Sequence, residues 1–136
     1  MLKRKFESVL NEWLKNDKVL LVDGARQVGK TYLIEEFCKK NFDNFIEINL
    51  SFIKDANSYF EHVKTVDDFL FVITSFSKKP FVPKKTVIFI DEIQLATKID
   101  LFTLSKPLSQ DGRYRFIFSG SLLGVAEFNI ALEPTG

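Results

Sequence analysis

The stretch from residue 19 to residue 31 constrains the fold of this chain more than any other. It begins with an apolar run, Val19 to Val22, passes through Asp23 into a glycine-bounded loop, and then takes on the pattern of a helix. The loop fits G-x-x-x-x-G-K-[ST] and reads Gly24-Ala25-Arg26-Gln27-Val28-Gly29-Lys30-Thr31. A strand, a tight loop and a helix in this order form the phosphate-binding unit of many nucleotide-binding proteins.

The constrained positions of this loop suit triphosphate chemistry. Glycines at 24 and 29 let the backbone turn its N–H groups toward phosphates, with no side chain in the way. Lys30 can set its ammonium against the β- and γ-phosphates, and Thr31 can offer its hydroxyl to Mg²⁺. The helix that begins here adds the positive end of its dipole. A glycine turn capping a lysine-rich helix is the plain alternative, but the strand and helix patterns around the match favour a nucleotide site.

The composition indicates one globular domain. The chain has 136 residues, 46% of them hydrophobic, with 15 Phe, which calls for a substantial buried core. Nineteen basic and 18 acidic residues leave a net charge of +1, so bulk charge does not mark a binder of nucleic acid or of an anionic membrane.

The single cysteine, Cys38, fits a reducing compartment and is expected to be a small buried hydrophobe. His62 is expected at the surface. No stretch has transmembrane length, and the basic N-terminus lacks an apolar run behind it, so we expect a cytoplasmic protein.

Helical and strand patterns alternate along the chain. Apolar periodicity predicts helices over 2–15 and 30–40, a short one around 57–63, one opened by the capping box at Thr65 and running to Phe76, and one within 97–109 that Pro107 interrupts. Strands are predicted over 18–23, 45–50, 86–90 and 114–118. The second strand alternates apolar and polar residues, which is typical of a strand near a sheet edge. Strands that alternate with helices predict an α/β fold with a parallel sheet.

Two acids come directly after the apolar strand 86–90. In P-loop ATPases an Asp at the end of such a strand holds the Mg²⁺ shell, a role that Asp91 fits. The adjacent Glu92 can act as the general base on the attacking water. Surface acids are common, but a phosphate loop upstream and four apolar residues before the pair favour the catalytic interpretation.

The next strand ends in Ser119-Gly120-Ser121. A hydroxyl of Ser119 or Ser121 can contact the γ-phosphate or orient the water, and a plain turn after the strand is an equal alternative. The loop, the two acids and these serines all fall at the carboxyl ends of parallel strands, where open α/β sheets bind their ligands.

Three stretches are similar to the signatures of a prokaryotic AAA-type ATPase family. They are residues 24–31, Ile90-Asp91-Glu92-Ile93-Gln94 and Gly120-Ser121-Leu122-Leu123-Gly124. The likeness covers residues 2 to about 125. The residue sequence of the phosphate loop, Gly-Ala-Arg-Gln-Val-Gly-Lys-Thr, is much more specific than the general P-loop pattern. The resemblance implies a P-loop NTPase fold of the additional-strand class, with the Ser119 strand between the loop strand and the Asp91 strand. It also implies Lys30 on phosphate, Thr31 and Asp91 on Mg²⁺, Glu92 as the base and Ser121 near the sensor position.

The chain departs from this family in its length. Members continue with a fifth core strand, a helical lid and a C-terminal domain, so residues 1–136 are expected to form an incomplete AAA-type ATP-binding domain without lid or C-terminal domain. Arg113 and Arg115 fall at the start of a strand and are poor candidates for an arginine finger. The loop strand would then keep one unpaired apolar edge, which predicts self-association.

These observations predict ATP binding and Mg²⁺-dependent ATP hydrolysis by an AAA-type core whose DNA or protein target is not encoded in any recognisable motif. One alternative is a nucleotide-binding module that signals by ATP or ADP occupancy without hydrolysis. Another is a P-loop kinase acting on a small molecule, although a water-activating Glu92 suits hydrolysis better. A phosphate-release assay, with and without candidate small-molecule phosphate acceptors, distinguishes hydrolysis, binding without hydrolysis and kinase activity.

Overall fold

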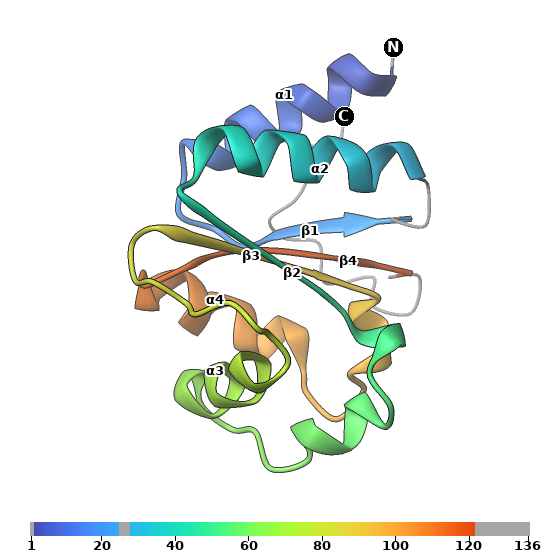
Figure 1. The fold of residues 1–136 in the computed structure, drawn as a ribbon, viewed down its shortest axis with the longest axis vertical. Helices are drawn as coiled ribbons and strands as arrows, with labels where there is room; N and C mark the ends of the chain where they lie inside the picture. The colour runs from blue at the N-terminus through green and yellow to red at the C-terminus, as the bar shows by residue number, and fades with distance from the viewer. Residues whose placement is uncertain (1, 25–27, 122–136) are drawn as a thin grey trace.

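A four-stranded parallel sheet forms the centre of the protein (Figure 1). The computed structural model describes residues 2–24 and 28–121. The strands are β1 (Leu20–Asp23), β2 (Asn44–Asn49), β3 (Thr86–Asp91) and β4 (Arg115–Gly120). They lie in the order β1-β4-β3-β2, and every neighbouring pair is parallel. The prediction that the Ser119 strand separates the loop strand from the Asp91 strand is therefore confirmed.

Helices cover both faces of the sheet. The helices are α1 (Leu2–Leu14), α2 (Val28–Asn41), α3 (Val66–Ser75) and α4 (Leu101–Asp111), with short 3₁₀ segments η1 (Leu50–Phe52), η2 (Ala56–Phe60) and η3 (Ile93–Leu95). Figure 1 shows α1 and α2 on one face and α3 and α4 on the other. Each face has its own cluster of buried side chains, so the sheet is the middle of three layers.

Burial along the strands follows their places in the sheet. All six residues of β3 are buried, as expected for an interior parallel strand. In the edge strand β2, Ile46 and Ile48 are buried on the α3/α4 side, whereas on the α2 side Phe45 is buried and Glu47 is exposed. This confirms the prediction of an edge strand.

Local signals in the sequence explain where two helices begin. At α3 the Thr65 hydroxyl accepts a hydrogen bond from the Asp68 N–H, and the Asp68 carboxylate accepts one from the Thr65 N–H, which is the predicted capping box. Asp100 caps α4 by accepting from the N–H groups of Phe102 and Thr103.

Two details differ from the sequence prediction. Pro107 does not interrupt its helix, because α4 runs through it from 101 to 111. A proline inside a helix costs about 3 kcal/mol, and burial of Leu101, Leu104 and Leu108 against the core outweighs that cost. The short helix expected around 57–63 is the 3₁₀ segment η2, three residues shorter at its carboxyl end.

Some predictions fall on parts of the chain outside the described residues. These are loop positions 25–27 and any strand after residue 124. No helix within residues 2–24 and 28–121 is both long enough and apolar enough to span a membrane.

Candidate nucleotide-binding site

The ends of β1, β4 and β3 meet at one edge of the sheet. The Gly24 N–H, just after β1, donates to the carbonyl oxygen of Gly120 at the end of β4, with an N···O distance of 3.0 Å. The Ser119 hydroxyl on β4 donates to Oδ1 of Asp91 at the end of β3, with an O···O distance of 2.8 Å. The predicted loop, acid and serine elements are thereby brought together.

The phosphate loop leaves β1 through a left-handed glycine. Gly24 has φ of +76°, a conformation that side-chain-bearing residues rarely adopt. Positions 25–27 lie outside the described residues, and Val28 and Gly29 open α2, whose N-terminus lies at the carboxyl edge of the sheet (Figure 1). A Cβ built on Gly24 or Gly29 meets no described atom within 4 Å.

Lys30 lies across the base of this loop. Its ammonium donates to the carbonyl oxygen of Asp23, at the end of β1, over 3.2 Å. The same ammonium is 5.8 Å from the centroid of the Phe6 ring on α1. Thr31 follows on α2 and is also half-buried. The cation and the hydroxyl predicted for phosphate and metal are thus both presented at the start of α2.

Asp91 is held in a defined orientation. Its side chain is buried, and Oδ1 accepts from the Ser119 hydroxyl and from the Glu92 N–H, each over 2.8 Å. Among the described residues, no group of three or more His, Cys, Asp or Glu side chains is arranged to hold a metal. The candidate ligands are one carboxylate, Asp91, and one hydroxyl, Thr31. Mg²⁺ is commonly held by such a small set of protein oxygens together with substrate phosphates.

Glu92 adopts a strained backbone conformation. Its φ is +58°, in the left-handed region that costs a non-glycine residue of the order of 1 kcal/mol. Its Oε1 accepts a 2.6 Å hydrogen bond from the side-chain amide of Gln94, and the amide oxygen of Gln94 accepts from the Ser121 N–H over 3.1 Å. The carboxylate of Glu92 thus contacts the side chain of Gln94, which in turn contacts the end of β4.

The two serines considered from the sequence are placed differently. Ser119 is completely buried and bonds Asp91. Ser121 is exposed and contributes its backbone N–H to Gln94. The sequence predicts a role for either hydroxyl and none for Gln94. The sequence signal for Gln94 is a polar residue between the apolar Ile93 and Leu95, two positions after Glu92.

Two groups on the α1/α2 side of the sheet have raised pKa values. Although Glu47 on β2 is exposed as a residue, partial desolvation of its carboxyl raises its pKa, the negative charges of Glu35 and Asp91 raise it further, and Lys39 opposes them. Burial raises the pKa of the Cys38 thiol to about 12, so this cysteine is an inert hydrophobe, as expected. His62 is exposed, also as expected.

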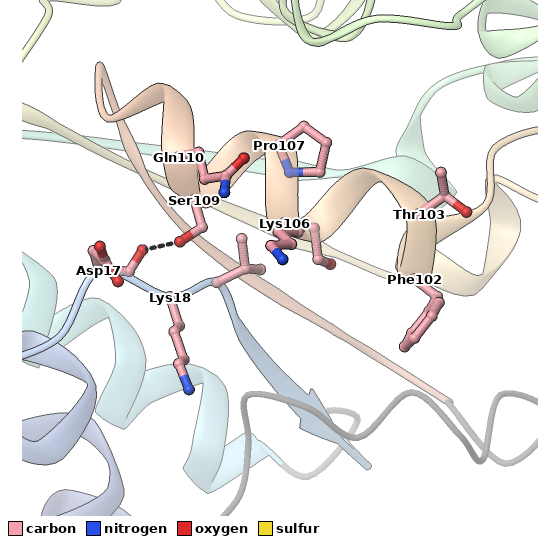
Figure 2. A pocket seen from close by; sticks show the side chains of 10 residues that line it. Asp17, Lys18, Phe102, Thr103, Lys106, Pro107, Ser109 and Gln110 are labelled. Atoms are coloured by element: carbon pink, nitrogen blue, oxygen red, sulfur yellow. Dashed lines mark hydrogen bonds between the residues drawn. The ribbon is translucent and has the colours of Figure 1, made fainter.

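A pocket of about 750 Å³ lies elsewhere, between α4 and the segment that leads into β1 (Figure 2). Asp17 and Lys18 line one side, and Phe102, Lys106 and Ser109 belong to the other. The Ser109 hydroxyl donates to the Asp17 carbonyl across it. The pocket shares no residue with the phosphate loop or the acidic pair, and it lies toward the amino end of β1, so cavity size does not decide where the candidate site is.

A parallel sheet with β4 between β1 and β3, a glycine loop leading from β1 into a helix, and an acid ending β3 define a P-loop NTPase. A family model described as an AAA domain matches residues 16–136, and the chain belongs to that family. The match confirms the resemblance drawn from the three sequence stretches. No curated protein matches the chain. Membership in the AAA-domain family implies nucleotide binding.

Proposed function

We propose that this domain binds ATP with Mg²⁺ and hydrolyses it, as the core of an AAA-type ATPase. The observation that carries the proposal is the buried hydrogen bond between Ser119 on β4 and Asp91 on β3. It lies at the ends of these two strands, and β4 is the neighbour of β1, from which the glycine loop leads into α2. It supports a fixed acid at the position where P-loop ATPases hold their metal.

Phosphate binding is assigned to the segment 24–31. In this proposal the ammonium of Lys30 leaves the Asp23 carbonyl for the β- and γ-phosphates, and the first N–H groups of α2 point at the same charge. Thr31 and Asp91 hold Mg²⁺, which supplies charge neutralisation on the phosphates when bound.

Water activation is assigned to Glu92. A carboxylate within hydrogen-bond distance of the attacking water can accept its proton. Ser121, near the γ-phosphate by family resemblance, is the candidate to orient that water, and Ser119 keeps Asp91 in place. The exposed Ser121 is free of the buried contact that fixes Ser119.

The Lys30→Ala variant tests the phosphate-loop assignment. Loss of the main cationic contact is expected to weaken MgATP binding tenfold or more, about 1.4 kcal/mol per factor of ten. Lys40→Ala is the matched control, because Lys40 is an exposed lysine of the same helix, roughly 15 Å along its axis. Equal MgATP affinity in wild type and a folded Lys30→Ala variant, measured by calorimetry, contradicts the assignment.

Hydrolysis has two rivals: nucleotide binding without turnover, and phosphoryl transfer to a small molecule. Phosphate release from MgATP without an acceptor supports hydrolysis. Release that requires an added acceptor supports a kinase, and binding with no release supports a module that signals by ATP or ADP occupancy. Glu92 favours hydrolysis, because activation of water is the task of a general base at this position.

A second copy of the chain is the proposed partner. Within the described sheet β1 pairs only with β4, which leaves its other edge without a described strand, and Leu20, Leu21 and Val22 make it apolar. Apolar edge strands tend to recruit another chain. Light scattering over a concentration series tests this, and a monomer at high concentration contradicts it. A cytoplasmic location is proposed with it, on the single, buried Cys38.

A further inference from the structure

The side chain of Gln94 joins the ends of two neighbouring strands. Its amide nitrogen donates to Oε1 of Glu92, after β3, and its amide oxygen accepts the N–H of Ser121, after β4. The N···O distances are 2.6 and 3.1 Å. Both ends of one planar amide are therefore used, so its orientation is fixed and the nitrogen faces the carboxylate.

Gly120 makes room for this arrangement. Its φ of +154° and its missing side chain let Gln94 lie directly over the end of β4, and a Cβ built there would collide with the amide oxygen of Gln94. The backbone N–H of Ile93 would lie only 3.1 Å from that Cβ. The glycine at the end of β4 is thus matched to the glutamine on η3.

We propose that Gln94 is a positioning residue that fixes the Glu92 carboxylate relative to the end of β4, so that the base and the candidate sensor serine move as one unit. The inference rests on the proposed hydrolysis and adds a residue to it. Glu92 has a left-handed backbone conformation at the start of η3, and the amide donor of Gln94, within η3, supplies the orientation that a base needs. Gln94 acts through Glu92 and touches no reacting atom.

Two variants distinguish orientation of the Glu92 carboxylate from a purely structural role, in which Gln94 only connects η3 to the end of β4. Gln94→Met keeps the length and bulk of the side chain and removes both hydrogen bonds. Gln94→Glu keeps an acceptor for the Ser121 N–H but replaces the donor to Glu92 with a second carboxylate. A residue that merely ties η3 to β4 tolerates Gln94→Glu, whereas a residue that orients the base does not.

Steady-state kinetics give the decisive measurement. Both variants are expected to keep MgATP Kd and KM within about threefold of wild type while kcat falls about tenfold, the pattern of an interaction made for the transition state. In the Glu92→Gln background, Gln94→Met is expected to change kcat by less than about twofold, because the group it positions is already gone. Wild-type kcat in Gln94→Glu, or a full additional loss in the double variant, overturns the proposal.

A spectroscopic arm tests the contact without turnover. The chain has three glutamines, Gln27, Gln94 and Gln110, so ¹⁵N-glutamine labelling gives three side-chain amide pairs, and Gln94→Met identifies one of them. Glu92→Ala is expected to shift the Gln94 pair and speed its hydrogen exchange, and an unchanged pair overturns the proposal.

The outcomes also distinguish this inference from the function it rests on. Failure of the wild-type chain to bind MgATP defeats the proposed function. Binding without turnover defeats hydrolysis and the positioning role together. Turnover that is equal in wild type, Gln94→Met and Gln94→Glu defeats the role of Gln94 alone.

Discussion

The two ends of the sheet use polar residues in opposite ways. At the carboxyl end, Asp91, Glu92 and Ser119 bond to one another or to Gln94, around a loop whose glycines leave open space. At the amino end, Arg113 and Arg115 reach across to helices. Polar groups at one end bond to one another beside the proposed nucleotide site, and at the other they connect the sheet to its helices.

Arg115 is the clearest case at the amino end. It starts β4, and its guanidinium lies 4.3 Å from the centroid of the Trp13 ring and donates to the carbonyl of Trp13 over 2.8 Å. Burial lowers its pKa, which the charge of Asp17 partly opposes. It satisfies a carbonyl at the end of α1, at the amino end of β4 and so at the opposite edge of the sheet from Gly24.

The largest expected effect lies at the carboxyl end. Glu92→Gln keeps the size of the side chain but removes the base, so turnover of ATP is expected to fall roughly 10²-fold or more while MgATP affinity stays within about threefold. Glu61→Gln, at an exposed position after η2, is the matched control. Unchanged turnover in Glu92→Gln, measured by phosphate release, would make Glu92 a structural acid and erase the contrast between the two ends.

The next effect lies at the amino end and is on stability. Arg115→Met is expected to lower the free energy of unfolding by about 2 kcal/mol, because it removes a cation–π contact and leaves a carbonyl of α1 without its donor. Arg115→Lys keeps the charge but not the planar fork, and should recover only part of the loss. Urea unfolding measures both. A loss of MgATP affinity in folded Arg115→Met would show that the two ends are not independent.

Much of the contrast between the two ends of the sheet could be predicted from the sequence. Apolar runs predicted the strands. The loop pattern and the acids after strand 86–90 predicted which residues gather at the carboxyl end, because such motifs are local in the chain. The position of β4 between β1 and β3 was implied by family resemblance, and the position of β2 near an edge was predicted from its alternating pattern; the structure confirms both. The catalytic and ligand roles of residues 24–31, Asp91, Glu92 and Ser121 stay predictions.

What could not be foreseen depends on contacts between distant residues. Ser119 and Asp91 are 28 positions apart, and only the pairing of β3 with β4 decides that Ser119, and not Ser121, meets the acid. Arg115 and Trp13 are separated by 102 positions, with no pattern that links them. The prediction that Pro107 interrupts its helix is wrong because helix propensity is local, whereas burial of Leu104 and Leu108 is set by the whole core.

A pair of serine variants sharpens the view of the carboxyl end. Ser119→Ala removes a buried hydrogen bond to Asp91, so it is expected to cost about 1 kcal/mol of stability and to raise the Mg²⁺ concentration needed for ATP binding. Ser121→Ala leaves the backbone N–H that Gln94 uses, so stability should stay within about 0.5 kcal/mol. Mg²⁺ titrations and urea unfolding of both variants check this. A larger stability loss in Ser121→Ala than in Ser119→Ala contradicts the arrangement.

The smallest effect concerns acid stability at the amino end. Hydrogen bonds from the Arg113 guanidinium hold the pKa of Asp111 below its usual value, and the same guanidinium bonds Asp67 at the start of α3. A carboxyl whose pKa is lower folded than unfolded adds stability above its unfolded pKa of about 3.9, and that stability disappears as the pH falls through the lower, folded pKa. Asp111→Asn is therefore expected to lower stability at pH 7 by less than about 1 kcal/mol, as for an exposed ion pair. It should also flatten the fall of the unfolding free energy below pH 4.

Asp43→Asn, which removes the longer 3.5 Å pair with Lys85, is the control and should change the slope of the unfolding free energy against pH, measured below pH 4, less than Asp111→Asn does. An identical acid slope in wild type and Asp111→Asn would show that Arg113 fastens α3 to the sheet without its charge pairing to Asp111.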